Sequence, residues 1–279
     1  MCMICEAFGE GTRWYYNPKN YARQMYKRRK PGQGAKDFGT DPEAESGRLQ
    51  EEMLNTRFTD RDKFEELVRE ANERMLDPRF QIGQVIPLRE ALEVCDLAYP
   101  IAALGCICRR MARACEETSF AEYSCTGLGV GMFKWERWPE RYKGGVYFMS
   151  PDEAKEWLTK WDKRGMMHMI MTFGGSYVGG LCNCDYPDCG PIRNRVDYGL
   201  IPALFKGHHV AKVNYDQCNG CGVCVQRCQF GAIKFEVSID RPNIDHLRCF
   251  GCGLCETGCP RKAIELLERE SMPALREVW

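Results

Sequence analysis

Two short stretches near the end of the chain decide its fold, CNGCGVCVQRC at residues 218–228 and CFGCGLCETGCP at residues 249–260. Each contains four cysteines with the spacing C-x2-C-x2-C-x3-C. A shift of 31 residues superposes these cysteines, and it also places Val213-Asn214-Tyr215 over Ile244-Asp245-His246 and Ala232-Ile233 over Ala263-Ile264. Because the match includes apolar residues outside the motifs, it indicates a duplicated structural unit. We expect each half to be a strand, a cysteine loop, a short helix and a strand.

The cysteine spacing indicates iron–sulfur clusters. Three thiolates at two-residue steps on a glycine-containing loop can bind three irons of one cubane, and the fourth thiolate then binds the cluster of the other half. The predicted ligands are therefore interleaved, with Cys218, Cys221, Cys224 and Cys259 for cluster one and Cys249, Cys252, Cys255 and Cys228 for cluster two. Zinc is the alternative metal, but a tetrahedral zinc site needs two C-x2-C pairs separated by a longer loop.

Through these paired motifs, residues 212–268 resemble the bacterial two-cluster 4Fe-4S ferredoxins. The resemblance implies a pseudo-twofold domain with two [4Fe-4S] clusters that transfers single low-potential electrons without making bonds on a substrate. One position departs from the family. The proline after the fourth cysteine is present as Pro260, but Gln229 replaces it in the first half. We expect this change to loosen one turn and to alter hydrogen bonding or solvent access at its cluster.

Ten further cysteines precede the repeat. Two groups stand out among them, Cys106 and Cys108 with Cys115 and Cys125, and Cys182 and Cys184 with Cys189. This region loosely resembles an N-terminal module of multi-cluster ferredoxin-type proteins of anaerobes, in which a CxCR segment and a CNC segment precede the dicluster domain. The resemblance implies an architecture and little about mechanism.

The two C-x-C segments lie in glycine-rich stretches, where the backbone can approach sulfur closely. Arg109 and Arg110 would offset the negative charge of a thiolate-bound cluster and lower the thiol pKa values. We therefore predict a third metal site, either an iron–sulfur cluster or zinc, with free buried or redox-active thiols as the remaining alternative. Seven thiols exceed one four-ligand site, so either some are spare or there are two sites.

Other candidate ligands are weaker. Cys95 follows Leu92 on an amphipathic helix and is expected in the core. The terminal pair Cys2 and Cys5 could complete a site or be incidental, and we favour the second interpretation. His208-His209 lies in a linker and is expected to be solvated. No catalytic residue is predicted, and GLGVG at 127–131 lacks the third glycine of a dinucleotide-binding loop.

The composition describes a globular protein large enough for two domains, with 279 residues, 39 basic and 39 acidic side chains and 18 cysteines. Residues 97–108 contain no charged residue, but this run of 12 residues is too short to span a bilayer. The start of the chain lacks the basic and apolar regions of a secretory signal, so we expect a cytoplasmic location. Disulfides do not persist there, which leaves the thiols buried, catalytic or metal-bound.

We predict an α+β fold in three parts. Residues 1–40 form a basic aromatic arm, residues 41–205 a Cys-rich α+β domain, and residues 206–279 the ferredoxin domain with a C-terminal tail. In the middle part, apolar periodicity predicts helices over 43–55, 60–76 and 88–98 and strands over 146–149 and 168–173. Ser150-Pro151-Asp152-Glu153 is a capping box that opens a further helix to residue 163, and Thr59 is a candidate cap.

The arm at residues 11–36 contains eight basic residues and no acidic one, interleaved with one tryptophan and four tyrosines. Such a segment can dock on an acidic partner, bind nucleic acid or stay solvated. We favour docking on a larger redox enzyme or its other subunits and consider nucleic acid the weakest of these.

These features predict an oxygen-sensitive electron-transfer protein that serves a larger anaerobic oxidoreductase as a subunit or dedicated donor. The rival interpretation is an enzyme whose site at Cys106, Cys108, Cys182 and Cys184 keeps an open metal position. Its candidate acids are Asp185 and Asp188, although such loop residues are usually turn formers. A third alternative is a redox-sensing regulator that binds nucleic acid through the arm.

Overall fold

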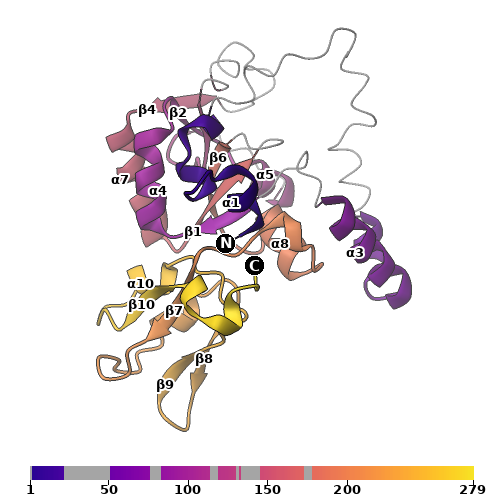
Figure 1. The fold of residues 1–279 in the computed structure, drawn as a ribbon, viewed down its shortest axis with the longest axis vertical. Helices are drawn as coiled ribbons and strands as arrows, with labels where there is room; N and C mark the ends of the chain where they lie inside the picture. Colours follow the sequence, from indigo (N-terminus) through magenta and orange to yellow (C-terminus); the bar gives the residue numbers. More distant parts are fainter. Residues whose placement is uncertain are drawn as a thin grey trace.

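The computed structural model describes residues 2–21, 51–75, 83–113, 119–129, 132, 145–172 and 178–279. A six-stranded sheet with flanking helices occupies one half of the molecule, and a C-terminal unit with two small two-stranded sheets occupies the other (Figure 1). Both halves mix helices and strands, which confirms the predicted α+β class.

The large sheet has the strand order β1-β5-β6-β3-β2-β4, and every neighbouring pair is antiparallel. The strands are β1 (Gly83–Ile86), β2 (Ile101–Leu104), β3 (Cys125–Leu128), β4 (Val146–Met149), β5 (Met167–Thr172) and β6 (Val178–Cys184). β4 and β5 confirm the two strands predicted from the sequence.

One face of this sheet is covered by two helices, α4 (Leu88–Leu97) and α7 (Pro151–Lys163), which pack side by side (Figure 1). α7 buries Trp157, Leu158 and Trp161, which recur at helical spacing. The predicted capping box is present, because Ser150 Oγ accepts from the Glu153 amide and the Glu153 carboxylate accepts from the Ser150 amide. These bonds explain where α7 begins.

The opposite face carries sulfur. Side chains alternate along β5 and β6, so that Ile170 and Leu181 join the core under α4 and α7 while Met169 and Cys184 join a separate core on the other side. The short helices α5 (Ile107–Arg113) and α8 (Gly190–Val196) follow cysteine-bearing segments at this face. The sheet therefore separates an aromatic core from a sulfur-rich one.

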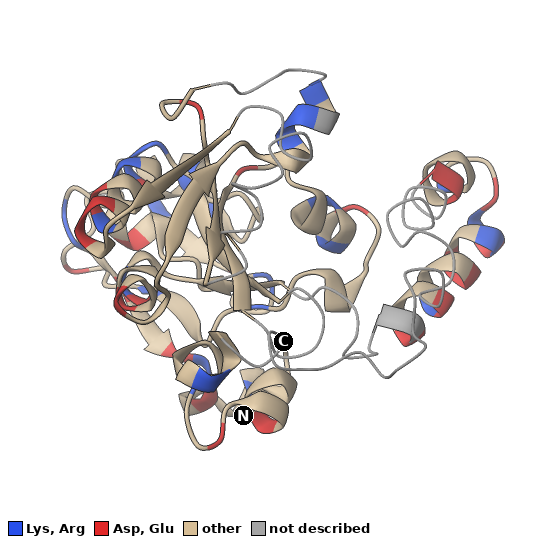
Figure 2. Ribbon diagram, turned by 90° about the horizontal axis from the view of Figure 1, so that it is seen from above, with Lys and Arg blue, Asp and Glu red and all other residues tan. Residues whose placement is uncertain are grey.

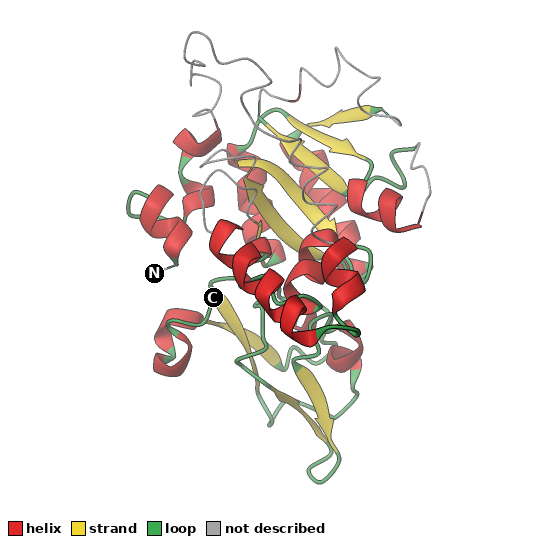
Figure 3. Ribbon diagram, turned by 90° about the vertical axis from the view of Figure 1, so that its right-hand side faces the viewer, coloured by secondary structure: helices red, strands yellow, loops and turns green. Residues whose placement is uncertain are grey.

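The C-terminal unit repeats one order of elements twice. Its elements are β7 (His209–Val213), α9 (Val223–Arg227) and β8 (Ile233–Glu236), then β9 (Arg241–Ile244), α10 (Leu254–Thr257) and β10 (Ile264–Glu268). β7 pairs with β10 and β8 with β9, forming sheets separate from the large one (Figure 3). Gly222 and Gly253 precede the two helices with φ of 73° and 80°, a conformation that glycine adopts without strain. The short turns η7 (Arg269–Ser271) and η8 (Pro273–Leu275) end the chain.

The beginning of the chain differs from the predicted arm. α1 (Met3–Phe8), η1 (Trp14–Tyr16) and η2 (Pro18–Tyr21) pack against the large sheet's core, where Trp14 and Tyr15 have no exposed surface. Arg13 forms ion pairs with Glu90 and Glu268 instead of remaining free for an acidic partner. The aromatic rings carry so much apolar surface that burial outweighs their basic surroundings. Residues 22–36 of the predicted arm lie outside the described residues.

Helix α3 (Arg61–Met75) lies beside the main body and carries charges of both signs along its length (Figure 2). Its apolar side chains Leu67 and Ala71 pack against Tyr198 and the segment of η6 (Ile201–Ala203). The cap of α3 is Asp60, whose carboxylate accepts from the Lys63 amide, and not Thr59 as predicted. Of the earlier helix predicted over 43–55, residues 51–55 are described and are helical. No described helix combines the length and the apolar character needed to cross a membrane.

Candidate metal centres

The first predicted ligand set meets at one pocket. Cys218, Cys221 and Cys224 of the first motif line it together with Cys259 from the second motif. The Gly220 amide donates to Cys218 Sγ at 3.5 Å, and the Ala263 amide donates to Cys259 Sγ at 3.2 Å. Amide donors of this kind stabilise thiolates, so the pocket has the donors that an iron–sulfur cluster requires.

The second predicted ligand set lies deeper. Burial raises the pKa of Cys252 to about 12 and that of Cys255 well above its usual value, and the nearby thiols of Cys249 and Cys228 raise both further. The Ala211 amide donates to Cys249 Sγ at 3.5 Å. Because these thiols stay protonated without a metal, a cluster that binds here displaces protons and supplies the charge that offsets the thiolates.

Comparison with known proteins identifies the type of domain that the C-terminal unit contains. Residues 217–263 match the family described as the 4Fe-4S dicluster domain. The C-terminal unit is a ferredoxin-type domain. A ferredoxin of Rickettsia felis is 38% identical over 53 residues, which are 19% of this chain and 43% of that protein. The chain thus spans less than half of this relative's length.

A second group of sulfurs gathers outside the ferredoxin-type domain. We name it the six-cysteine group; its members are Cys106, Cys108, Cys125, Cys182, Cys184 and Cys189. They come from the start of α5, from β3, from β6 and from the residue before α8. Cys125 and Cys182 lie directly opposite each other in the β3–β6 ladder. The fold therefore brings together six of the seven cysteines predicted here; Cys115 lies outside the described residues.

Contacts run through the whole six-cysteine group. Side-chain hydrogen bonds join Cys108 to Cys106, Cys106 to Cys125 and Cys125 to Cys182. Further bonds join Cys182 to Cys184 and Cys184 to Cys189, and the charge of Cys189 acts on Cys108. The sulfurs thus form a series of neighbours that runs from Cys108 to Cys189.

Neighbouring thiols lower the pKa of two of these sulfurs. Hydrogen bonds from Cys108 and Cys125 lower the pKa of Cys106 to about 2, and those from Cys125 and Cys184 lower the pKa of Cys182 to about 5. The same bonds raise the pKa of Cys125 and Cys184. Soft thiolates in this number suit iron–sulfur clusters or zinc.

Arg109 is the basic residue at this group. Its amide donates to Cys106 Sγ at 3.4 Å, and its positive charge contributes to the low pKa of Cys106, as expected from the sequence. The guanidinium also pairs with Asp185 at 3.1 Å and with Asp188 at 3.7 Å, and Arg113 pairs with Asp188 at 2.6 Å. The two carboxylates proposed as candidate acids are therefore partners of arginines.

Gln229 joins the two halves of the molecule. Its amide nitrogen donates to the carbonyls of Gly165 at 2.6 Å and Cys184 at 3.2 Å, and its carbonyl oxygen accepts from the Tyr186 amide at 3.0 Å. Gln229 follows Cys228 of the second ligand set, and Cys184 belongs to the six-cysteine group. The departure from the ferredoxin pattern thus forms a specific contact that a proline could not make.

Two sequence-based expectations about histidine are wrong. His208 and His209 are 6% and 2% exposed, so neither is solvated. His209 Nε2 lies 2.5 Å from the buried Glu90 carboxylate, and His208 Nε2 faces Cys2 and Cys5. Sequence reasoning missed these contacts because 119 residues separate His209 from Glu90, and more than 200 separate His208 from Cys2 and Cys5. Cys95 is in the core, as expected, with its thiol donating to the Ala91 carbonyl.

Proposed function

We propose that this protein is an iron–sulfur electron-transfer protein of the cytoplasm in which three centres form one electron path. The ferredoxin-type domain, with two halves related by a pseudo-twofold axis, would hold two [4Fe-4S] clusters on the interleaved ligand sets. The six-cysteine group would hold a third iron–sulfur centre. Each centre supplies one-electron chemistry, while the chain provides thiolates, amide donors to sulfur and a low-dielectric setting.

The contact between Gln229 and Cys184 is the observation that carries this proposal. It connects a residue next to a cluster-two ligand with a ligand of the six-cysteine group. One apolar core also contains Cys184 and Cys189 together with Cys228 and Cys252, with Met167 packed among them. A ferredoxin that carries only its own two clusters does not require contact with another cysteine group. An electron path between two centres, in contrast, needs close, rigid, water-free packing between them.

The exposure of the two ligand sets suggests which cluster would meet a partner protein. Cys221 of the first ligand set is exposed, whereas Cys249 and Cys255 of the second are buried. Cluster one would therefore exchange electrons with a larger oxidoreductase at the surface, and cluster two would pass them to or from the six-cysteine group. The ferredoxin-type domain would then take part in docking, while residues 22–36 of the predicted basic arm lie outside the described residues and docking through them stays a prediction.

Iron, acid-labile sulfide and zinc per chain, measured on anaerobically prepared protein, test the proposal. Two [4Fe-4S] clusters give about eight irons, and a third cubane gives about twelve. We expect the double variant Cys182→Ser/Cys184→Ser to lose only the additional iron and to keep about eight. The variant Cys95→Ser is the matched control, since it removes a buried thiol that donates to the Ala91 carbonyl, and its iron content should equal that of the wild type.

Two results would overturn the proposal. About eight irons in the wild type, with zinc in the six-cysteine group, would limit redox chemistry to the C-terminal domain. Turnover of a small substrate by the isolated chain would favour the rival interpretation as an enzyme. The pairing of Asp185 and Asp188 with arginines gives that rival no free acid at these positions.

A further inference from the structure

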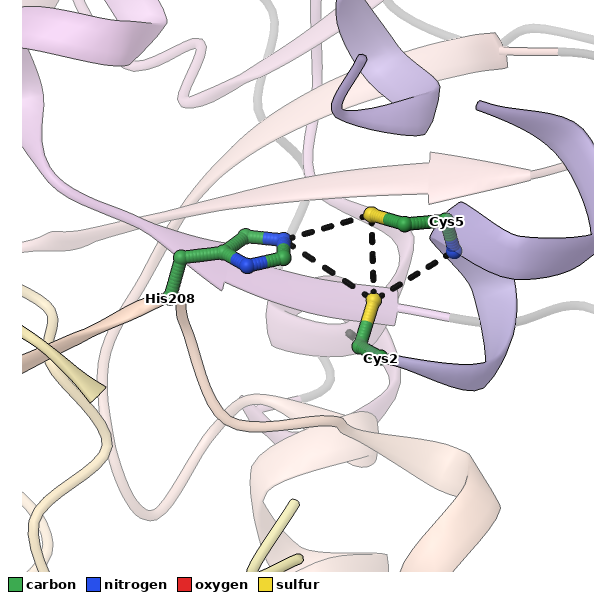
Figure 4. A group of neighbouring side chains, drawn as sticks. All are labelled: Cys2, Cys5 and His208. Carbon is green, nitrogen blue, oxygen red and sulfur yellow. Dashed lines mark hydrogen bonds between the residues drawn. The ribbon is translucent and has the colours of Figure 1, made fainter. Parts of the chain in front are cut away.

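A third set of soft ligands lies apart from both groups of cysteines. Cys2 precedes α1, Cys5 lies within α1, and His208 lies just before β7, yet their side chains point toward one another (Figure 4). The two Sγ atoms are 3.1 Å apart, and His208 Nε2 lies 3.4 Å from Cys5 Sγ and 3.8 Å from Cys2 Sγ. All three residues are buried.

We propose that Cys2, Cys5 and His208 bind a zinc ion. Zn–S bonds of about 2.3 Å and Zn–N bonds of about 2.0 Å at tetrahedral angles place two sulfurs about 3.8 Å apart and sulfur and nitrogen about 3.5 Å apart. The two observed sulfur–nitrogen distances lie on either side of that value. The sulfurs need to separate by less than about 1 Å to complete the geometry.

Amide groups around the two sulfurs donate hydrogen bonds that favour the thiolate form, which binds a cation. The Cys5 amide donates to Cys2 Sγ at 3.4 Å, and the Gln84 side-chain amide donates to the same sulfur at 3.6 Å. The backbone amide of Trp14 donates to Cys5 Sγ. Gln84 is itself fixed, because its oxygen accepts from Trp14 Nε1 at 2.5 Å and its nitrogen donates to the Lys206 carbonyl at 3.1 Å. Such outer partners orient metal ligands and stabilise their anionic form.

Charge balance favours a divalent ion. Binding replaces the thiol protons of Cys2 and Cys5, which pass to solvent, and two thiolates with neutral His208 and Zn²⁺ have no net charge. The His208 ring packs against the rings of Tyr15 and Trp279, and in such a buried setting a neutral site is favoured over one with net charge. Among the described residues, no fourth Cys, His, Asp or Glu offers an atom within 4.8 Å of all three ligand atoms. One coordination position is therefore left for water or a small exogenous ligand.

The position of the site gives it a structural role. It would fasten the start of the chain to the segment that enters the ferredoxin-type domain, with Gln84 of β1 beside it. This role does not depend on which metal the six-cysteine group binds.

Zinc K-edge X-ray absorption on the full chain, loaded anaerobically with its iron and then with Zn²⁺, tests the proposal because iron does not contribute to that edge. We expect a shell of two sulfurs at about 2.3 Å and two nitrogen or oxygen atoms at about 2.0 to 2.1 Å. A shell of four sulfurs would place the zinc at other cysteines and overturn the proposal.

Metal content of variants provides the second readout. Cys2→Ser/Cys5→Ser and His208→Asn should each lose one zinc per chain and retain the iron content of the wild type. Cys95→Ser is the control and should retain both metals. Zinc content unchanged in the His208→Asn protein would overturn the proposal, as would a Cys2–Cys5 disulfide in anaerobic wild-type protein that takes up no zinc. Unchanged iron in these variants separates this result from a failure of the third iron–sulfur centre.

Discussion

At the scale of single residues, Gln229 shows how one substitution can adapt a ferredoxin-type domain to a neighbour. In the ferredoxin pattern a proline would fix the turn after Cys228, whereas here the glutamine side chain bonds to Gly165, Cys184 and Tyr186. The sequence predicts altered hydrogen bonding at this position, and the structure identifies the partners. The sequence alone does not identify the hydrogen-bond partners of Gln229, because they lie 43 to 64 residues earlier in the chain.

We predict that Gln229→Ala slows electron transfer between cluster two and the six-cysteine group while leaving the iron content unchanged. The variant removes the bonds to Cys184 and Gly165 but no ligand. Freeze-quench EPR after rapid reduction should show the ferredoxin-type clusters reduced at the normal rate and the third centre reduced later. Gln226→Ala is the matched control, since Gln226 is exposed on helix α9, three residues before Gln229. Equal rates in both variants would remove Gln229 from the path.

His209 predicts how stability depends on pH. Burial lowers the pKa of His209 to about 4, against the opposing charge of Glu268. The unfolded chain binds a proton near the ordinary histidine pKa of about 6.5, whereas the folded chain does so only near pH 4. Stability is therefore greatest above pH 6.5 and falls as the pH drops toward 4, with a slope of at most about 1.4 kcal/mol per pH unit.

Melting temperatures of the wild type and His209→Gln between pH 5.5 and 7.5 test this expectation. The wild type should lose stability on acidification more steeply than the variant, which lacks the titrating group. Parallel curves would show that His209 is protonated in the folded protein as readily as in the unfolded chain.

At the scale of secondary structure, local rules predicted elements well where the responsible residues are neighbours in sequence. The box at Ser150 and Glu153 fixes the start of α7, and the apolar periodicity gave β5 within one residue. The cysteine repeat predicted two copies of one set of elements. Prediction failed where the deciding partner is distant. Trp14 donates to Gln84, and His208 meets Cys2, so neither burial nor contact follows from the local pattern.

We predict that Ser150→Ala destabilises the protein through α7 alone. Loss of an N-cap hydrogen bond costs about 1 kcal/mol, which corresponds to a fall of about 2 °C in the melting temperature for a chain of this size. Anaerobic thermal unfolding followed by circular dichroism measures the shift, and iron content should not change. Ser238→Ala, in the exposed turn between β8 and β9, should melt as the wild type does. If the two variants melt together, the cap does not contribute to stability.

At the scale of the whole molecule, the two halves share an apolar core that packs against Cys228 and Cys252 of the second ligand set. Phe230 and Phe250 stack with ring centroids 4.0 Å apart, and the same core contains Val85, Met167 and Leu204 from the other half. Phe250 follows Cys249 directly. The packing between halves would therefore also determine how far solvent can reach a cluster bound to the second ligand set.

We predict that Phe230→Ala makes cluster two more sensitive to oxygen while leaving cluster one unaffected. Phe230 is 6% exposed, and truncating a buried phenylalanine leaves a cavity at a cost of about 3 to 5 kcal/mol. The loosened core admits solvent and oxygen on the side of Cys249 and Cys228, whereas the pocket of cluster one does not include Phe230. On exposure to air, the variant should lose about four irons rapidly and the rest at the wild-type rate.

Phe235→Ala is the matched control, because Phe235 lies in the same domain on β8 with 36% of its surface exposed, and its iron loss should follow the wild type. If Phe230→Ala loses iron at the wild-type rate, or loses both clusters together, the contact between the halves does not protect cluster two specifically.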